Sequence, residues 1–166
     1  MLKILFFLLL CPCFSTLATE YQSKEEFLLE AFSGTPPKPQ ILWLKKDLKK
    51  AATQILKHKP GFLRLRYWKN TKQSVWIINE TGKTQPITIA IIVKNKKITQ
   101  LKVLAFRESR GWEVKHSFFT DQFKQNSLNS NFSLSNPIDG ISGATLSVRA
   151  LTKTAQLALF FDSQIE

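Results

Sequence analysis

The chain has 166 residues, of which 43% are hydrophobic, and its formal net charge is +12 at pH 7. This length and apolar content suit one globular domain with a real core, and no repeat or low-complexity segment is present. So basic a chain could bind nucleic acid, but the export signal described below argues against that class of partner. The charge then leaves two interpretations open: solvated lysines, or a docking surface for an acidic protein or for anionic lipid headgroups.

Residues 1–18 are typical of a secretory signal peptide. Lys3 supplies the positive end, Ile4–Leu10 is apolar, and Thr16–Ala18 offers small residues at the cleavage positions. The apolar run is shorter than the roughly 20 residues that span a bilayer, so we expect cleavage after Ala18 and export. A retained anchor that keeps the protein at the inner membrane is the less favoured alternative.

Both cysteines, Cys11 and Cys13, lie inside this signal segment. Cleavage therefore leaves a chain without thiols, which excludes disulfides and cysteine-ligated clusters. Lipidation of Cys11 is a minor alternative, because a bulky leucine directly before the cysteine fits a lipoprotein cleavage site badly.

Residues 19–60 are predicted to form an N-terminal helical segment. Ser23 and Glu26 form a capping box, which predicts a short helix that continues to Ala31. Gly34 and the prolines that follow it end this helix.

A second, longer helix is expected after Pro39, because apolar residues keep helical spacing from Ile41 and Leu44 through Ile55. Two interpretations of this helix stay open: it packs on a sheet, or it lies on a membrane surface. Its lysines point away from the apolar stripe and are Lys45, Lys46, Lys49, Lys50 and Lys57.

After Pro60 and Gly61 the hydrophobic period changes to two, which predicts strands. Short turn signals separate the strands, so an antiparallel sheet of about four strands in meander order follows. Pro86 is best placed at a strand start, where its missing N–H does no harm. The predicted strands are Phe62–Trp68, Val75–Ile78, Ile87–Val93 and Ile98–Phe106.

A short helical piece through Phe118–Phe123 and a polar surface loop over residues 124–137 come next. A C-terminal helix follows from Leu146 onward, because apolar residues recur at steps of three and four. Its predicted buried face consists of Val148, Leu151, Ala155 and Ala158, and its predicted opposite face of Arg149, Thr152, Lys153 and Gln156.

The loop Asp139–Thr145 ends where this helix begins, so Thr145 lies at a helix N-terminus. Free backbone N–H groups and the positive end of the helix dipole favour a phosphate there. Gly140 and Gly143 would let the backbone approach such an anion closely. The physics alone predicts an anion-binding loop, with an ordinary loop and helix cap as the alternative.

The string Asp-Gly-Ile-Ser-Gly-Ala-Thr at 139–145 resembles the flavinylation motif of the FMN-binding domain family. Members of this family occur in the sodium-translocating NADH:quinone oxidoreductase and in the Rnf complex. The resemblance implies that a flavin transferase links the phosphate of FMN to Thr145 as a phosphoester, and that Asp139 is needed for this modification. The cofactor-binding residues it implies here are Asp139, Gly140, Ile141, Ser142, Gly143, Ala144 and Thr145.

A looser resemblance to the family covers roughly residues 82–160. A Glu and a Gly occupy a similar place in the family, which implies that Glu108 and Gly111 lie near the cofactor, together with Arg110 and Trp112. The alternative for Glu108 and Arg110 is a surface ion pair. By the same resemblance, residues 61–166 are expected to be the FMN-binding domain.

Positive charge near the flavin would favour its reduced form. The candidate tryptophans Trp68, Trp76 and Trp112 either stack on the flavin or belong to the core. The candidate cations are Arg64, Arg66, Arg107, Arg110 and Arg149.

His58 and His116 lack metal-ligand spacing, and His58 is expected to cap the lysine-rich helix. Ser142 lacks the preceding glycine of a nucleophile elbow, which argues against a hydrolase. The resemblance, together with the export signal, implies an electron carrier in the bacterial periplasm and not an enzyme, and the predicted elements give it an α+β fold. Its expected partners are a flavin transferase and a membrane or cytochrome redox protein. A non-redox module for a phosphorylated ligand or an anionic membrane is the alternative, while a flavin enzyme lacks an identifiable proton donor.

Overall fold

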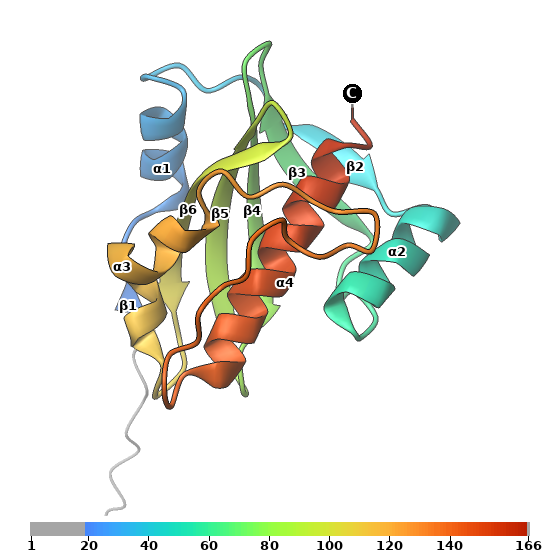
Figure 1. Ribbon diagram of the computed structural model, residues 1–166. Helices are drawn as coiled ribbons and strands as arrows, with labels where there is room; N and C mark the ends of the chain where they lie inside the picture. The colour runs from blue at the N-terminus through green and yellow to red at the C-terminus, as the bar shows by residue number, and fades with distance from the viewer. Residues whose placement is uncertain (1–18, 166) are drawn as a thin grey trace, which may run out of the picture.

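The computed structural model describes residues 19–165, which fold into one antiparallel sheet with helices on both of its faces (Figure 1). The expected signal segment, residues 1–18, lies outside the described residues, as do both cysteines. Within residues 19–165, no helix is both long enough and apolar enough to cross a membrane. The α+β fold class that the sequence predicts is confirmed.

The described part of the chain contributes six strands to the sheet, in the order β1-β6-β5-β4-β3-β2. The predicted four-strand meander corresponds to β3–β6, and Pro86 is the first residue of β5, as expected. The predicted strand number was too low, because β1 and β2 add to the two edges of this meander. The strands are β1 (Thr19–Glu20), β2 (Gln40–Trp43), β3 (Arg64–Lys69), β4 (Ser74–Thr81), β5 (Pro86–Lys94) and β6 (Lys97–Phe106).

Residues 40–43 form an edge strand, although the sequence predicts a helix there. Ile41 and Leu44 do stand at helical spacing with later apolar residues, but residues 40–43 pair in antiparallel register with β3, from Gln40 opposite Tyr67 to Trp43 opposite Arg64. This pairing satisfies backbone groups that a frayed helix start would leave open.

The helices of the described residues are α1 (Lys24–Ala31), α2 (Lys46–Leu56), α3 (Ser117–Thr120) and α4 (Thr145–Asp162), with 3-10 turns at Trp112–Lys115 and Asp121–Phe123. The second helix is therefore shorter than predicted, while the helical piece through Phe118–Phe123 is confirmed. The polar stretch 124–137 is a loop, as expected, although Asn126 and Leu134 are buried in it.

The short helix α1 covers one face of the sheet. Its predicted capping box is present: the Glu26 N–H donates to Ser23 Oγ at 3.1 Å, and the Ser23 N–H donates to Glu26 Oε2 at 3.0 Å. Phe27, Leu28 and Phe32 pack against the strands on this face, and Trp68 borders the same cluster.

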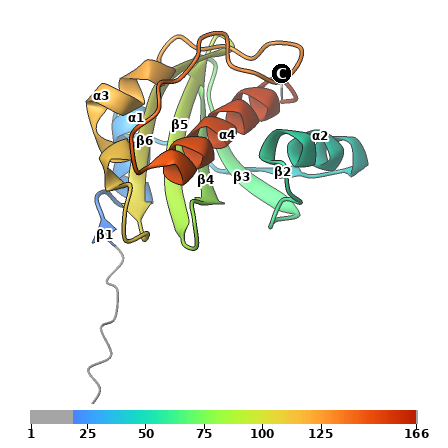
Figure 2. The same ribbon diagram turned by 60° about the horizontal axis from the view of Figure 1, so that its bottom comes forward.

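The long helix α4 lies across the other face of the sheet, with α2 beside it (Figure 2). Trp76 is fully buried there, with its ring 4.9 Å from Tyr67 and 5.8 Å from Phe161, so it belongs to the core. The buried face of α4 is wider than predicted, because α2 and the loop 124–137 pack against the helix as well. It also includes Ser147, Ala150, Thr154 and Leu157, whereas Val148 is only partly buried.

One end of the sheet gathers several distant chain segments. The β4–β5 turn lies there, since Thr81 pairs with Pro86 across it. β6 runs antiparallel to β5 and ends at Phe106, and β1 begins opposite it, with Thr19 paired with Phe106. The start of α4 lies at this same end (Figure 1).

Candidate functional site

Three segments enclose a hollow of about 580 Å³ at this end of the sheet. They are the β4–β5 turn, the stretch 107–111 after β6, and the loop that leads into α4. A volume of this size lies in the range of sites that hold drug-sized ligands and cofactors. The hollow is lined by Lys83, Glu108, Ser109, Arg110, Gly143, Ala144, Thr145, Leu146 and Ser147.

Thr145 is the first residue of α4, as the sequence predicts, and its exposed side chain lines the hollow. The residue before it, Ala144, has no side chain that could accept a hydrogen bond, so the first turn lacks a side-chain cap. The Thr145 hydroxyl has no hydrogen-bond partner within residues 19–165, whereas Thr152 and Thr154 donate to the carbonyls of Val148 and Ala150. An open hydroxyl and open N–H groups therefore meet at one helix start.

Of the two motif glycines, only Gly143 needs glycine's conformational freedom. Its φ is +80°, in the left-handed region, whereas Gly140 has no positive φ. A Cβ at either position would meet no heavy atom within 4 Å. The backbone turn therefore uses glycine's freedom at Gly143, while close approach of an anion to either glycine stays a prediction.

Gly111 lets the stretch 107–111 approach the start of α4. Its φ is +86°, and an added Cβ would lie 2.7 Å from Ser147 Oγ and 3.3 Å from Ala144 Cβ. Ser147 is buried, so this neighbour has little room to move. The loosely predicted Gly111 is thus in direct contact with the predicted flavin loop.

The carboxylate of Glu108 holds the β4–β5 turn in place. Its Oε1 accepts the backbone N–H groups of Lys83 at 2.5 Å, Thr84 at 2.6 Å and Gln85 at 2.8 Å. Burial alone raises the pKa of Glu108, but these hydrogen bonds outweigh it and lower the pKa below its ordinary value. Glu108 makes no ion pair with Arg110 in the described residues, so that alternative was wrong.

The structure does not bring every predicted site residue into the hollow. Asp139 is exposed, and its N–H donates to Gln122 Oε1 at 2.7 Å, which anchors the loop to the turn Asp121–Phe123. Trp112 is 47% exposed beside His116 and does not line the hollow. Three further motif residues, Gly140, Ile141 and Ser142, also lie outside the lining.

The predicted cations are divided among several places. Arg110 and, in addition, Lys83 line the hollow. Arg107 instead donates to the Pro86 carbonyl at 3.1 Å and to Thr88 Oγ1 at 3.0 Å, so it is a structural residue. Arg64 and Arg66 belong to β3, outside the lining.

Arg149 lines a second, smaller hollow of about 250 Å³. Leu146 belongs to both linings, so the two hollows are neighbours. The second hollow is lined by His58, Glu80, Thr81, Gly82, Leu146, Arg149, Ala150 and Lys153.

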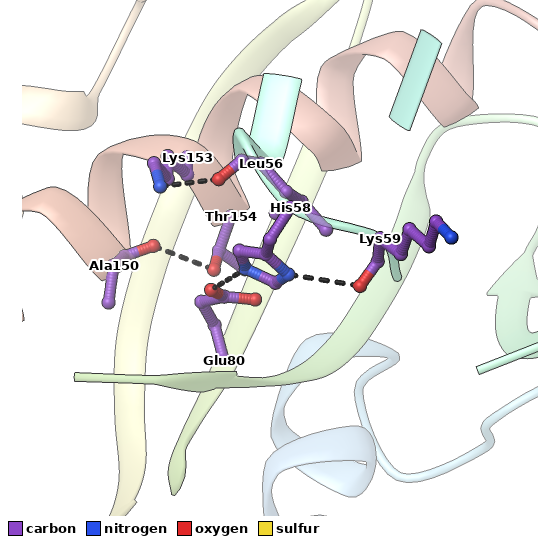
Figure 3. A network of polar contacts seen from close by, with 7 residues as sticks. All are labelled: Leu56, His58, Lys59, Glu80, Ala150, Lys153 and Thr154. Carbon is purple, nitrogen blue, oxygen red and sulfur yellow. Dashed lines mark hydrogen bonds and ion pairs between the residues drawn. The ribbon is translucent and has the colours of Figure 1, made fainter. Parts of the chain in front are cut away.

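His58 does not cap α2, contrary to the expectation. The C-cap residue is Lys57, in the left-handed conformation, while Lys153 Nζ donates to the Leu56 carbonyl at the same helix end. Figure 3 shows His58 turned toward β4, where its Nε2 lies 2.7 Å from Glu80 Oε1, and its Nδ1 lies 3.0 Å from the Lys59 carbonyl. The hydrogen bond to Glu80 is the main cause that raises the pKa of His58.

Sequence reasoning missed the pair of His58 and Glu80. Strand alternation contained a signal, because Ser74, Trp76, Ile78 and Glu80 share the buried face of β4. A carboxylate on a buried face needs a partner, but the sequence alone does not identify it. No group of three or more potential metal ligands exists among residues 19–165.

We expect Gly143→Ala to lower the free energy of unfolding by about 1–2 kcal/mol, because alanine is strained at this left-handed φ. Gly140→Ala is the matched control, since its position is equally open but has no positive φ. Urea unfolding measures both. Equal losses in the two variants would contradict the assigned strain.

The pair of His58 and Glu80 should make stability depend on pH. The pKa of His58 is raised in the folded protein, so its contribution is complete below the unfolded pKa of about 6.5 and is lost as pH rises through the folded pKa. We expect the stability difference between wild type and His58→Gln to shrink from about pH 6.5 upward. Urea unfolding at a series of pH values tests this, with His116→Gln as the control. A difference that grows with pH would refute the assignment.

Comparison with known proteins places the larger hollow in a recognised domain. The sequence model of the FMN-binding domain family matches residues 82–159. This segment begins at the turn that Glu108 holds and ends within α4, so it contains every residue that lines the larger hollow. His58 and Glu80 lie outside it. A search of curated proteins finds no match to the chain.

Proposed function

Because residues 82–159 are an FMN-binding domain, whose cofactor is FMN, we propose that the protein is an electron carrier with FMN linked covalently to Thr145. The observation that carries the proposal is the position of this hydroxyl. It is exposed, lies at the first residue of a long helix and lines a hollow large enough for a cofactor. The resemblance of the motif 139–145 supports the same residue.

The residues around Thr145 fit a phosphate. The helix start has no side-chain cap, so its N–H groups and the helix dipole remain available for an anion. Lys83 and Arg110 add two cations to the lining, while the carboxylate of Glu108 is occupied by the turn. The site therefore presents net positive charge where the phosphate would be held.

Attachment requires an accessible hydroxyl at Thr145, and the resemblance implies that it also requires Asp139. In the proposed modification, the Thr145 Oγ forms a bond to the FMN phosphorus of FAD and loses its proton. The pyrophosphate bond of FAD breaks at the same time, and AMP leaves. A flavin transferase would supply the catalytic groups for this step. The exposure of Thr145 and of its neighbour Leu146 is compatible with access by such an enzyme.

Bound FMN supplies the capacity to take up and release one or two electrons. The protein's own residues hold it, keep it from diffusing away and set its charge environment. A covalent bond is useful to an exported protein, because a soluble cofactor would be lost by dilution. We therefore place the carrier in the periplasm, between a membrane or cytochrome donor and a further acceptor.

A non-redox role is the alternative. The same helix start could hold another phosphorylated ligand, and the exposed lysines of α2 could contact an anionic membrane. The membership of residues 82–159 in the FMN-binding family favours the flavin. The two functions differ in one simple property, since only the first gives a yellow protein.

We expect mass spectrometry of protein from its native host to find FMN on the peptide that contains Thr145. Thr145→Ala should abolish the adduct and cost only about 1 kcal/mol of stability, because it removes one exposed hydroxyl at a helix start. Thr152→Ala is the matched control, two turns further along α4, and should keep the adduct. An unmodified wild-type mass in a host with active flavin transferase would contradict the proposal, and so would a denaturation-resistant flavin on Thr145→Ala.

Docking by charge should make electron transfer depend on salt. With an acidic electron-transfer protein as donor, we expect the second-order rate to fall steeply as salt rises. The reason is that the Debye length shrinks from roughly 10 Å at 0.1 M to roughly 3 Å at 1 M. Stopped-flow measurements test this with the α2 substitutions Lys45→Gln, Lys46→Gln, Lys49→Gln and Lys50→Gln combined.

If α2 forms the docking face, the rate of this combined variant at low salt should be lowered nearly as much as high salt lowers the wild-type rate. A control variant neutralises four exposed lysines elsewhere, so that both proteins have the same net charge. An electron-transfer rate that does not change with salt would show that the α2 lysines are only a solvated helix face. Equal effects of the two variants on this rate would show the same. The control positions are Lys24, Lys72, Lys94 and Lys97.

A further inference from the structure

One face of α4 presents an unusual row of residues. Thr145, Arg149 and Lys153 follow one another at steps of four, so they lie one turn and about 6 Å apart along the helix. Like charges at this spacing destabilise a helix unless a neighbouring group compensates them. Lys153 donates to the Leu56 carbonyl, but Arg149 has no hydrogen bond or ion pair within residues 19–165. The row therefore begins at Thr145, the proposed attachment residue, and its next member, Arg149, carries a positive charge without a partner in the described residues.

The smaller hollow lies along this row. Arg149 and Lys153 line one side of it, and His58 and Glu80 line the other. Leu146, the residue after Thr145, contributes to the linings of both hollows. Thr145 is therefore adjacent in sequence to a residue that lines the smaller hollow.

The hydrogen bonds of His58 define its protonation. The Lys59 carbonyl can only accept, which assigns a hydrogen to Nδ1, and Nε2 faces a carboxylate (Figure 3). A hydrogen on Nε2 as well makes the ring an imidazolium that donates to both oxygens, and the raised pKa of His58 favours this form. The charged groups that face His58 are Glu80 from β4, and Lys153 and Arg149 from α4. When His58 is protonated, three cations and one carboxylate line the hollow, which leaves net positive charge.

We propose that this smaller hollow receives the polar edge of the flavin ring of FMN held at Thr145, and that His58 and Arg149 stabilise the charge of the reduced flavin there. The inference rests on the proposed function. The volume of the smaller hollow, about 250 Å³, is below the range of sites that enclose a whole cofactor. The hollow therefore suits only one edge of the flavin ring.

The N-terminal segment completes the site in this arrangement. His58 precedes the matched segment 82–159 by many residues and reaches the hollow only because α2 packs beside α4. The left-handed C-cap at Lys57 turns the chain toward β4, and the contact of Lys153 with Leu56 fixes the end of α2. A residue outside the family match is therefore a positioning and charge-supplying residue for the cofactor.

The reduction potential of the flavin tests the inference. One variant combines His58→Gln with Glu80→Gln, which avoids a buried unpaired carboxylate. A second, Arg149→Gln, changes only an exposed side chain. The matched controls are His116→Gln, beside Trp112, and Arg66→Gln on β3. Each protein is first weighed intact to verify equal FMN content and is then titrated spectroelectrochemically between pH 5.5 and about 9, which spans the ordinary histidine pKa.

We expect Arg149→Gln, which removes one positive charge, to disfavour reduction at pH 6 by about tenfold in the equilibrium constant, about 30 mV for a two-electron couple. The double variant removes one positive and one negative charge, so its pH dependence is the readout. The extra fall of the wild-type potential as pH rises through the pKa of His58 should vanish in the double variant. NMR gives an independent readout: the pKa of His58 should rise when the attached flavin is reduced, because negative charge favours the imidazolium. The two controls should match wild type in both measurements.

The outcomes are separable. An intact mass without FMN overturns the proposed function, and this inference with it. FMN on Thr145 with an unchanged potential in Arg149→Gln and with the wild-type pH dependence in the double variant overturns this inference alone. A shift in His116→Gln instead would place the ring beside Trp112 and also overturn it. If the double variant fails to fold, Arg149→Gln and the NMR titration of wild-type His58 decide the question.

Discussion

The site depends on the hydrogen bonds between the Glu108 carboxylate and three consecutive backbone N–H groups of the β4–β5 turn. They join the end of β6 to a turn more than twenty residues away in sequence, and they satisfy donors that would otherwise face only solvent. With Glu108 fixed, the stretch that follows it is fixed as well. Gly111 then fits against Ala144 and Ser147, where a side chain would collide. The start of α4 is thereby positioned from the sheet as well as by its own anchored loop.

The matched domain does not form the site surroundings alone. α2 lies against α4, and the segment that follows α2 delivers His58 to the buried carboxylate of Glu80. A buried carboxylate without a partner is costly, so His58 and the end of α2 are held to β4 by electrostatics as well as by packing. The N-terminal segment is part of the same sheet through β1 and β2. This segment therefore completes the sheet and brings His58 to Glu80.

Local signals predicted much of this structure. The meander β3–β6, the capping box at Ser23 and the position of Thr145 at a helix start all depend on residues close in sequence. The failures involve partners that are far apart. Residues 40–43 become a strand because β3 is available for pairing, although their spacing suits a helix equally well. Glu108 and His58 find their partners only after folding, so the sequence indicated a surface ion pair for the first residue and a helix cap for the second.

The edge strand β1 has a consequence for geometry. Thr19 pairs with Phe106, the last residue of β6, and the stretch after Phe106 forms one wall of the larger hollow. Thr19, the first described residue, therefore lies at the end of the fold where α4 begins (Figure 1). If an N-terminal tether joins the protein to a surface, the tether holds the larger hollow close to that surface. The hollow then does not face away from the surface. Encounter with a partner in the same surface is then set by an effective local concentration, which depends on tether length more than on bulk diffusion.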